Sequence, residues 1–321
     1  MTWECLYNRL LEGGSGDGEL TLDLADFLLD NDFKVDLKSV EREVSRYVSL
    51  YEDVCAFFDI KYIFHSRAFS SFLQSPREHV KHIIVPKIRR AVRRRVDPSR
   101  FYRLINLTVK KCIDTNCRIL FQNFVVLSML YNLYSFDVEF VYPNDSWFHL
   151  DRKGHQHGGV IPPNFIIRVN DGYFSFFLEA PRPVEWSLPL KSGEPLPLHA
   201  APRPDILIYR GWVENIVDKS STSIIKPPNF IIECKEVDGW WKSTRISKGI
   251  KHITNGEIEN VDAFSVMELY YELYKPEKIF LVSKVKVPRG VKYKLSLRGI
   301  ETIDNVNLNP ISMKKIVELI L

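Results

Sequence analysis

Residues 229–236 read Asn-Phe-Ile-Ile-Glu-Cys-Lys-Glu, and they predict a buried strand with charges at its C-terminal end. The run Phe230–Ile232 is apolar on both faces of such a strand, which is typical of a central position in a sheet. Because side chains alternate along a strand, Glu233 and Lys235 share one face while Cys234 points to the other.

A second apolar strand is predicted upstream, in Arg-Pro-Asp-Ile-Leu-Ile-Tyr (203–209), and Asp205 stands at its start. If the two strands pair antiparallel, Asp205, Glu233 and Lys235 converge at one edge of the sheet. Two neighbouring carboxylates repel each other unless one is protonated or a cation lies between them. Their oxygens suit Mg²⁺, or Mn²⁺, which polarises a phosphoryl group and activates water. The alternative is a surface hairpin with an ordinary Glu-x-Lys pair.

Pro204-Asp205 and Glu233-Cys234-Lys235 resemble the motif of the PD-(D/E)xK, or restriction-endonuclease-like, nuclease superfamily. The resemblance implies that Asp205 and Glu233 bind Mg²⁺ and that Cys234 offers its backbone carbonyl. It also implies that Lys235 positions the attacking water. The order of elements expected over residues 116–287 is similar to that of the family.

A closer resemblance is to the McrC-type nuclease subunit of modification-dependent restriction systems. It is carried by an apolar helix (121–130), a hairpin, Arg-Pro-Asp, the Glu-x-Lys strand, and a later helix with Met267 and Tyr270. Two positions depart from that pattern. Gln122 stands where many members have a Glu, and Val266 stands where a Lys or Gln is common.

The expected fold class is α/β: a restriction-endonuclease-like mixed sheet flanked by helices, preceded by a mostly helical N-terminal domain. We assign residues 1–110 to the helical domain and 111–321 to the nuclease-like domain. Three- and four-residue spacing of apolar positions predicts helices at the ranges that follow. They are 36–60, 77–95 with a break or start at Pro86, 99–113, 116–134, 260–274, and a last helix at Pro310 capped by Asn309.

Strands are expected at 138–142, 165–169, 173–178 and 278–287, in addition to the two at 205–209 and 229–235. Asn170-Asp171-Gly172 predicts a tight hairpin, since these residues tolerate positive φ. The segment 181–204 holds seven prolines, and we expect no regular structure there.

Charge is unevenly distributed along the chain. Residues 1–60 carry fourteen acidic and five basic side chains, although the whole chain has a net charge of +4. The densest basic stretch is 77–103, with ten Lys or Arg against two acids. Its centre is a candidate DNA-binding surface, because such clusters attract phosphate backbones; a solvated helix face is the alternative. The residues are Arg89, Arg90, Arg93, Arg94 and Arg95.

A second basic series follows the Glu-x-Lys strand and Trp240-Trp241, at Lys242, Arg245, Lys248 and Lys251. We expect it to contact DNA, with the tryptophans either stacking on bases or forming a buried pair.

Glu179 follows a predicted strand, and it either joins the metal ligands or pairs with Arg182. The polar loop with His149, His155 and His157 is more typical of a flexible or substrate-facing segment than of a zinc site.

The composition is that of an ordinary globular protein, with 45% hydrophobic and 26% charged residues. The longest apolar run, near 124–133, falls short of the ~18 residues that a membrane span needs. Residues 1–13 lack the apolar core of a secretory signal. Five cysteines at scattered spacings suit free thiols in a reducing cytosol, so we expect a cytoplasmic protein with no membrane partner.

These features predict a Mg²⁺-dependent DNA endonuclease. One such site cuts one strand, so double-strand cleavage requires a homodimer or a second nicking event. No Walker-type phosphate loop occurs, which leaves a motor NTPase subunit in trans as the source of any nucleotide hydrolysis. The alternative is a catalytically inactive nuclease-like module for nucleic-acid binding or complex assembly.

Overall fold

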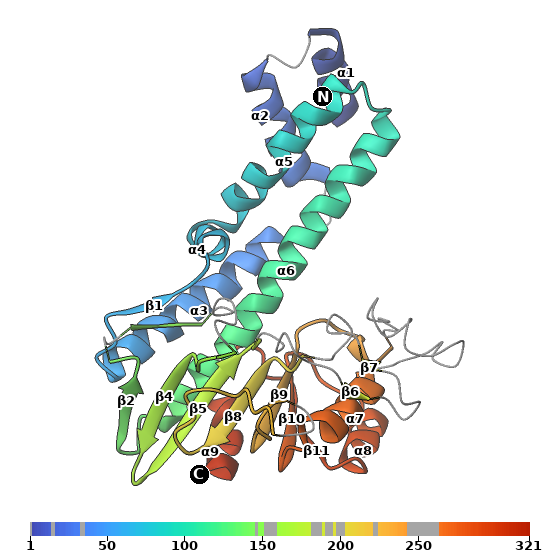
Figure 1. Ribbon diagram of the computed structural model, residues 1–321. Helices are drawn as coiled ribbons and strands as arrows, with labels where there is room; N and C mark the ends of the chain where they lie inside the picture. Colours follow the sequence, from blue (N-terminus) through green and yellow to red (C-terminus); the bar gives the residue numbers. More distant parts are fainter. Residues whose placement is uncertain are drawn as a thin grey trace. The chain divides into compact units, whose positions relative to one another are not determined.

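The computed structural model describes residues 2–13, 17–32, 36–144, 147–150, 159–180, 188–189, 195–196, 203–220, 224–242 and 263–321 (Figure 1). The chain forms two compact units, and α3 and α6 each contribute to both. Unit 1 comprises 1–48 and 66–120, and unit 2 comprises 49–65 and 121–321. The expected division at residue 110 stays a prediction. No helix in the described ranges has the length and apolar character that crossing a membrane requires.

Unit 1 is helical, as the sequence predicts for the N-terminal region. Its core contains the stacked rings of Tyr7 and Phe101, whose centroids are 4.0 Å apart. Its helices are α1 (Trp3–Gly13), α2 (Gly18–Phe27) with a π-helical turn η1 (Leu28–Asp32), the first part of α3 (Leu37–Phe57), α4 (Arg67–Gln74), α5 (Pro76–Arg93) and the first part of α6 (Pro98–Leu133).

Two helix predictions are wrong. The sequence predicts a break or start at Pro86 and separate helices at 99–113 and 116–134, but α5 runs through Pro86 and α6 is continuous. Proline removes a backbone hydrogen bond from a helix. The helix persists because Ile84 and Ile88, on either side of Pro86, are fully buried in the core of unit 1.

Unit 2 contains a seven-stranded mixed sheet in the order β11-β10-β9-β8-β5-β4-β2. β9, β10 and β11 are mutually parallel, and the remaining neighbours are antiparallel. The strands are β2 (Val138–Tyr142), β4 (Phe165–Val169), β5 (Gly172–Leu178), β8 (Ile206–Arg210), β9 (Phe230–Lys235), β10 (Lys278–Ser283) and β11 (Ile300–Ile303). A separate parallel pair joins β1 (Tyr62–Phe64) to β3 (Trp147–His149). The mixed sheet and the predicted hairpin turn after Val169 are thus confirmed.

Helices cover both faces of this sheet. α7 (Ala263–Tyr274) and α8 (Arg289–Ser296) pack through Tyr270 and Leu295 into a core shared with β8, β9 and β10. The end of α6 and α9 (Lys314–Ile320) meet β4 and β5 on the other side. The described residues of this unit also include the 3₁₀ turns η2 (Trp240–Lys242) and η4 (Pro310–Met313), and Asn309 caps η4 as predicted.

The proline-rich segment departs from its prediction. Within its described residues, β6 (Leu188–Pro189) pairs antiparallel with β7 (Pro195–Leu196). Both are edge strands of a two-stranded ladder, which is where proline is tolerated in a sheet.

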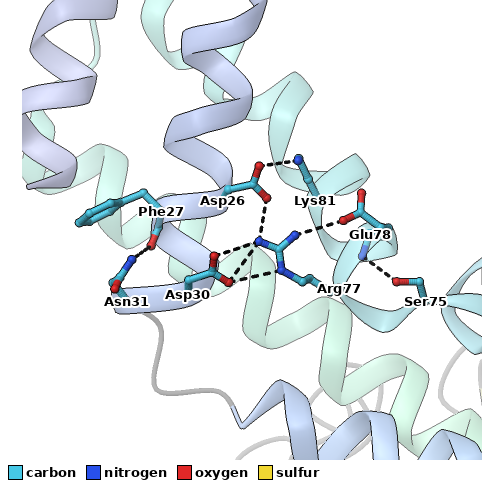
Figure 2. A network of polar contacts seen from close by, with 8 residues as sticks. All are labelled: Asp26, Phe27, Asp30, Asn31, Ser75, Arg77, Glu78 and Lys81. Atoms are coloured by element: carbon cyan, nitrogen blue, oxygen red, sulfur yellow. Dashed lines mark hydrogen bonds and ion pairs between the residues drawn. The ribbon is translucent and has the colours of Figure 1, made fainter. Parts of the chain in front are cut away.

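A polar network joins α2 and η1 to the start of α5 in unit 1 (Figure 2). Asp26 pairs with Lys81 at 2.6 Å and with Arg77 at 2.8 Å, and Arg77 also contacts Asp30 at 3.1 Å. Burial acts to raise the pKa of Asp26, but hydrogen bonds from Lys81 and Arg77 outweigh it and lower that pKa. The ionised carboxylate therefore stabilises unit 1 at neutral pH. That contribution is lost as the pH falls below about 3.8 through the lowered pKa.

We predict that Asp26→Asn lowers the free energy of unfolding by about 1 kcal/mol at pH 7, since it leaves two half-buried cations with weaker partners. Chemical denaturation of the whole chain measures this change. Asp23→Asn is the matched control, because Asp23 is exposed and makes no ion pair within the described residues. Equal effects of the two substitutions would contradict the assigned role of Asp26.

Candidate active site

The ends of two strands position the acidic residues of the predicted site. β8 and β9 are antiparallel, and their last paired residues at this end are Ile206 and Ile232. Asp205 comes directly before Ile206, and Glu233 comes directly after Ile232. The two carboxylates therefore lie at the same end of the sheet, which confirms the antiparallel arrangement on which the sequence argument depended.

Asp205 takes over a hydrogen bond that the strand pairing no longer provides. Its Oδ2 accepts the backbone N–H of Cys234 at 2.7 Å, and its Oδ1 accepts Nε2 of Gln122 at 2.5 Å. Gln122 is a buried residue of α6. A helix and the neighbouring strand thus fix both oxygens of this carboxylate.

Glu233 is held by two other donors. Its Oε1 forms an ion pair with Nζ of Lys235 at 2.6 Å, and its Oε2 accepts the hydroxyl of Tyr270 at 2.9 Å. Tyr270 belongs to α7 and is fully buried, while Lys235 keeps about a quarter of its side chain exposed. Lys235 therefore reaches from the carboxylates toward solvent.

The electrostatics of the cluster follow from two acids and one nearby cation. Burial raises the pKa of Asp205 well above its ordinary value, and the charge of Glu233 adds to this. Lys235 and the Cys234 N–H oppose the change without cancelling it. Burial acts to lower the pKa of Lys235, but Glu233 and Asp205 outweigh it and raise that pKa. When both Asp205 and Glu233 are ionised, the cluster has two negative charges and only the one positive charge of Lys235.

The donor set of the cluster fits a hard divalent cation. Each of the four carboxylate oxygens accepts one hydrogen bond and keeps a further lone pair. Mg²⁺ commonly binds through one or two carboxylates and keeps several waters. Among the described residues, no group of three or more His, Cys, Asp or Glu side chains is placed to hold a metal ion. The carbonyl of Cys234 as a ligand stays a prediction.

Glu179 lies beside the cluster and has a partner of its own. It follows β5, its backbone N–H donates to the carbonyl of Asp205 at 2.8 Å, and its charge contributes to the raised pKa of Asp205. Its Oε2 accepts Nη2 of Arg203 at 3.1 Å. The alternative partner, Arg182, lies outside the described residues.

The second basic series is described only at its start. Lys242 is exposed at the end of η2, while Arg245, Lys248 and Lys251 lie outside the described residues. Trp240 is buried, contacts Trp241 edge to face, and its Nε1 lies 3.3 Å from Oγ of Ser283. The tryptophans thus pack against each other, as in the buried-pair alternative, but only Trp240 is fully buried and Trp241 is partly exposed.

The five arginines of the first basic series belong to unit 1 and are all exposed. None of them pairs with a carboxylate within the described ranges, in contrast to Arg77 and Lys81 earlier in α5. His149 lies in β3, while His155 and His157 are outside the described residues.

Sequence reasoning missed two contacts at this site. The sequence points to Tyr270 only through the family resemblance, and it gives no role to Arg203. Their signals are weak: one of three tyrosines on α7, and an arginine two residues before Asp205. No family model, curated protein or solved structure matches the chain.

We predict that Asp205→Asn raises the free energy of unfolding by about 1 kcal/mol at neutral pH. A buried acid with a raised pKa destabilises the folded state when ionised, and asparagine removes that charge. Gln122 can turn its amide so that its carbonyl accepts the new N–H donor. Denaturant titration measures the change.

Glu301→Gln is the control of opposite sign. A hydrogen bond from Lys315 is the main cause of the lowered pKa of Glu301, which also pairs with Lys278. Removing this charge lowers the stability slightly. A loss of stability in both variants would show that Asp205 belongs to an ordinary structural ion pair.

Proposed function

We propose that the chain is a Mg²⁺-dependent, or Mn²⁺-dependent, DNA endonuclease of the PD-(D/E)xK class. The observation that supports this proposal is the junction of Asp205, Glu233 and Lys235 at one end of the sheet, with a charge deficit that suits a divalent cation. The mixed sheet with helices on both faces is compatible with a restriction-endonuclease-like fold, which is part of the same proposal.

In this mechanism Asp205 and Glu233 would hold the metal, together with the carbonyl of Cys234. Gln122 and Tyr270 keep the two carboxylates in place through their hydrogen bonds. A bound Mg²⁺ would polarise a phosphoryl oxygen and lower the pKa of a water ligand.

Lys235 contributes positive charge to the pentavalent transition state. Its raised pKa keeps it protonated, so it acts as a hydrogen-bond donor rather than as a base. Glu179 is paired with Arg203 and lies beside Asp205, so we do not assign it as a metal ligand. A homodimer, or a motor NTPase subunit in trans, stays part of the proposal for cleavage of both strands.

A second candidate function is a non-catalytic nucleic-acid-binding module. It is favoured by the complete hydrogen bonding of the cluster, in which each carboxylate oxygen already has a donor. The two candidates differ in whether Lys235 is needed for chemistry.

We predict that Lys235→Ala lowers the rate of metal-dependent nicking of supercoiled plasmid by about 100-fold or more, because it removes the cation nearest the reacting phosphate. The assay is run with Mg²⁺, with Mn²⁺ and with EDTA, and circular dichroism checks the fold. Lys226→Ala is the matched control, since Lys226 is an exposed lysine of unit 2. Cleavage that survives Lys235→Ala would reject the assigned site, and no cleavage by the unaltered chain would favour the binding module.

We also predict that Arg93→Ala with Arg94→Ala weakens DNA binding and makes its salt dependence less steep. Each lost phosphate contact lowers the slope of log K against log salt by about 0.9. Arg9→Ala with Lys38→Ala removes the same charge from exposed positions elsewhere in unit 1. Equal slopes for the two double variants would leave the arginines as a solvated helix face.

A further inference from the structure

The segment Lys284–Ile300, which links β10 to β11 through α8, is strongly basic. It contains six Lys or Arg residues and no Asp or Glu. It begins beside the candidate active site, since the backbone N–H of Lys284 donates to the carbonyl of Lys235 at 2.9 Å. The segment follows β10 and starts next to the end of β9, the strand that carries Glu233 and Lys235.

Two of these cations are neutralised by nearby acids. Lys292 pairs with Asp304 at 2.6 Å, and Arg298 pairs with Glu268. Three others are exposed and have no carboxylate partner in the described ranges of the chain: Lys286, Arg289 and Lys294.

The packing of α8 directs Arg289 outward. Leu295 is fully buried in the core that also contains Tyr270. Arg289 and Tyr293 lie one turn apart on the opposite side of the helix, and the Tyr293 side chain is 64% exposed. No side chain caps the start of α8, and a Cβ at Gly290 would meet no atom within 4 Å. A phosphate can thus approach the first turn of the helix closely.

We propose that this surface, made by Lys286 and Arg289 and called the α8 surface, binds the phosphate backbone of DNA next to the cleaved bond. Two residues of extended chain span at most about 7 Å, so Lys286 lies close to the end of the catalytic strand. This inference rests on the proposed function, because the endonuclease proposal is what identifies the polyanion as DNA.

An anionic membrane is the main competing partner, because exposed Tyr293 and Leu297 accompany the cations on α8. Nucleic acid is favoured by the contact between the segment and Lys235. Membrane binding would not explain why the segment starts beside the acidic cluster. Vesicle binding is therefore one arm of the test.

The test measures binding of the full chain to a short DNA duplex in EDTA, by fluorescence anisotropy over a range of NaCl concentrations. Lys286→Glu with Arg289→Glu should weaken binding at least about tenfold and reduce the salt slope by roughly 2. Lys226→Glu with Lys314→Glu makes the same change in charge at exposed positions of unit 2, and it should weaken binding less than about threefold. Circular dichroism and thermal melting confirm that both variants fold.

Equal weakening by the two double variants, or none by either, would overturn the inference. So would a loss confined to mixed phosphatidylcholine and phosphatidylserine vesicles with DNA binding unchanged. Because no metal is present, this readout is separate from cleavage. Failure of the endonuclease proposal appears in the plasmid assay, whereas failure of the α8 surface appears here.

Discussion

The candidate site depends on the hydrogen bond between the Asp205 carboxylate and the backbone N–H of Cys234. The pairing of β8 with β9 stops at Ile206 and Ile232, and β9 continues beyond it. An N–H left without a strand partner in a buried place is costly. The side chain of Asp205 satisfies it, and in doing so the carboxylate is brought beside Glu233. The need to satisfy this one backbone N–H therefore places the two acids close together. Because the pair is buried, a nearby positive charge is required to stabilise both carboxylates in their ionised form.

The part of this arrangement that follows from local rules could be predicted. Alternation along a strand places Glu233 and Lys235 on one face, and the apolar run before them marks a central strand. The positions of Gln122 and Tyr270 could not be predicted in the same way. They reach the cluster from helices 83 and 37 residues away from their partners, and helical periodicity does not tell which neighbour a buried polar group will meet.

The errors in the fold have a similar origin. Asp114 and Thr115 have low helix propensity and suggest a boundary, yet they are exposed in the middle of α6, and the buried Ile113 and Asn116 beside them hold the helix together. The short elements α8 and β11 carry too few apolar positions to show a period. In each case tertiary packing determined the secondary structure, which the local sequence alone did not determine.

The four hydrogen-bond donors to the two carboxylates, three side chains and the backbone N–H of Cys234, come from α6, β9 and α7. The hydroxyl of Tyr270 is the last of them along the chain. During synthesis, residues 122–235 can emerge and begin to pack while Oε2 of Glu233 still lacks its donor. In such a nascent chain Asp205 and Glu233 are present, but the hydrogen bond from Tyr270 has not yet formed. The cluster thus acquires its full set of hydrogen bonds only after α7 has docked, and under the proposed function nuclease activity would begin only when most of unit 2 has folded.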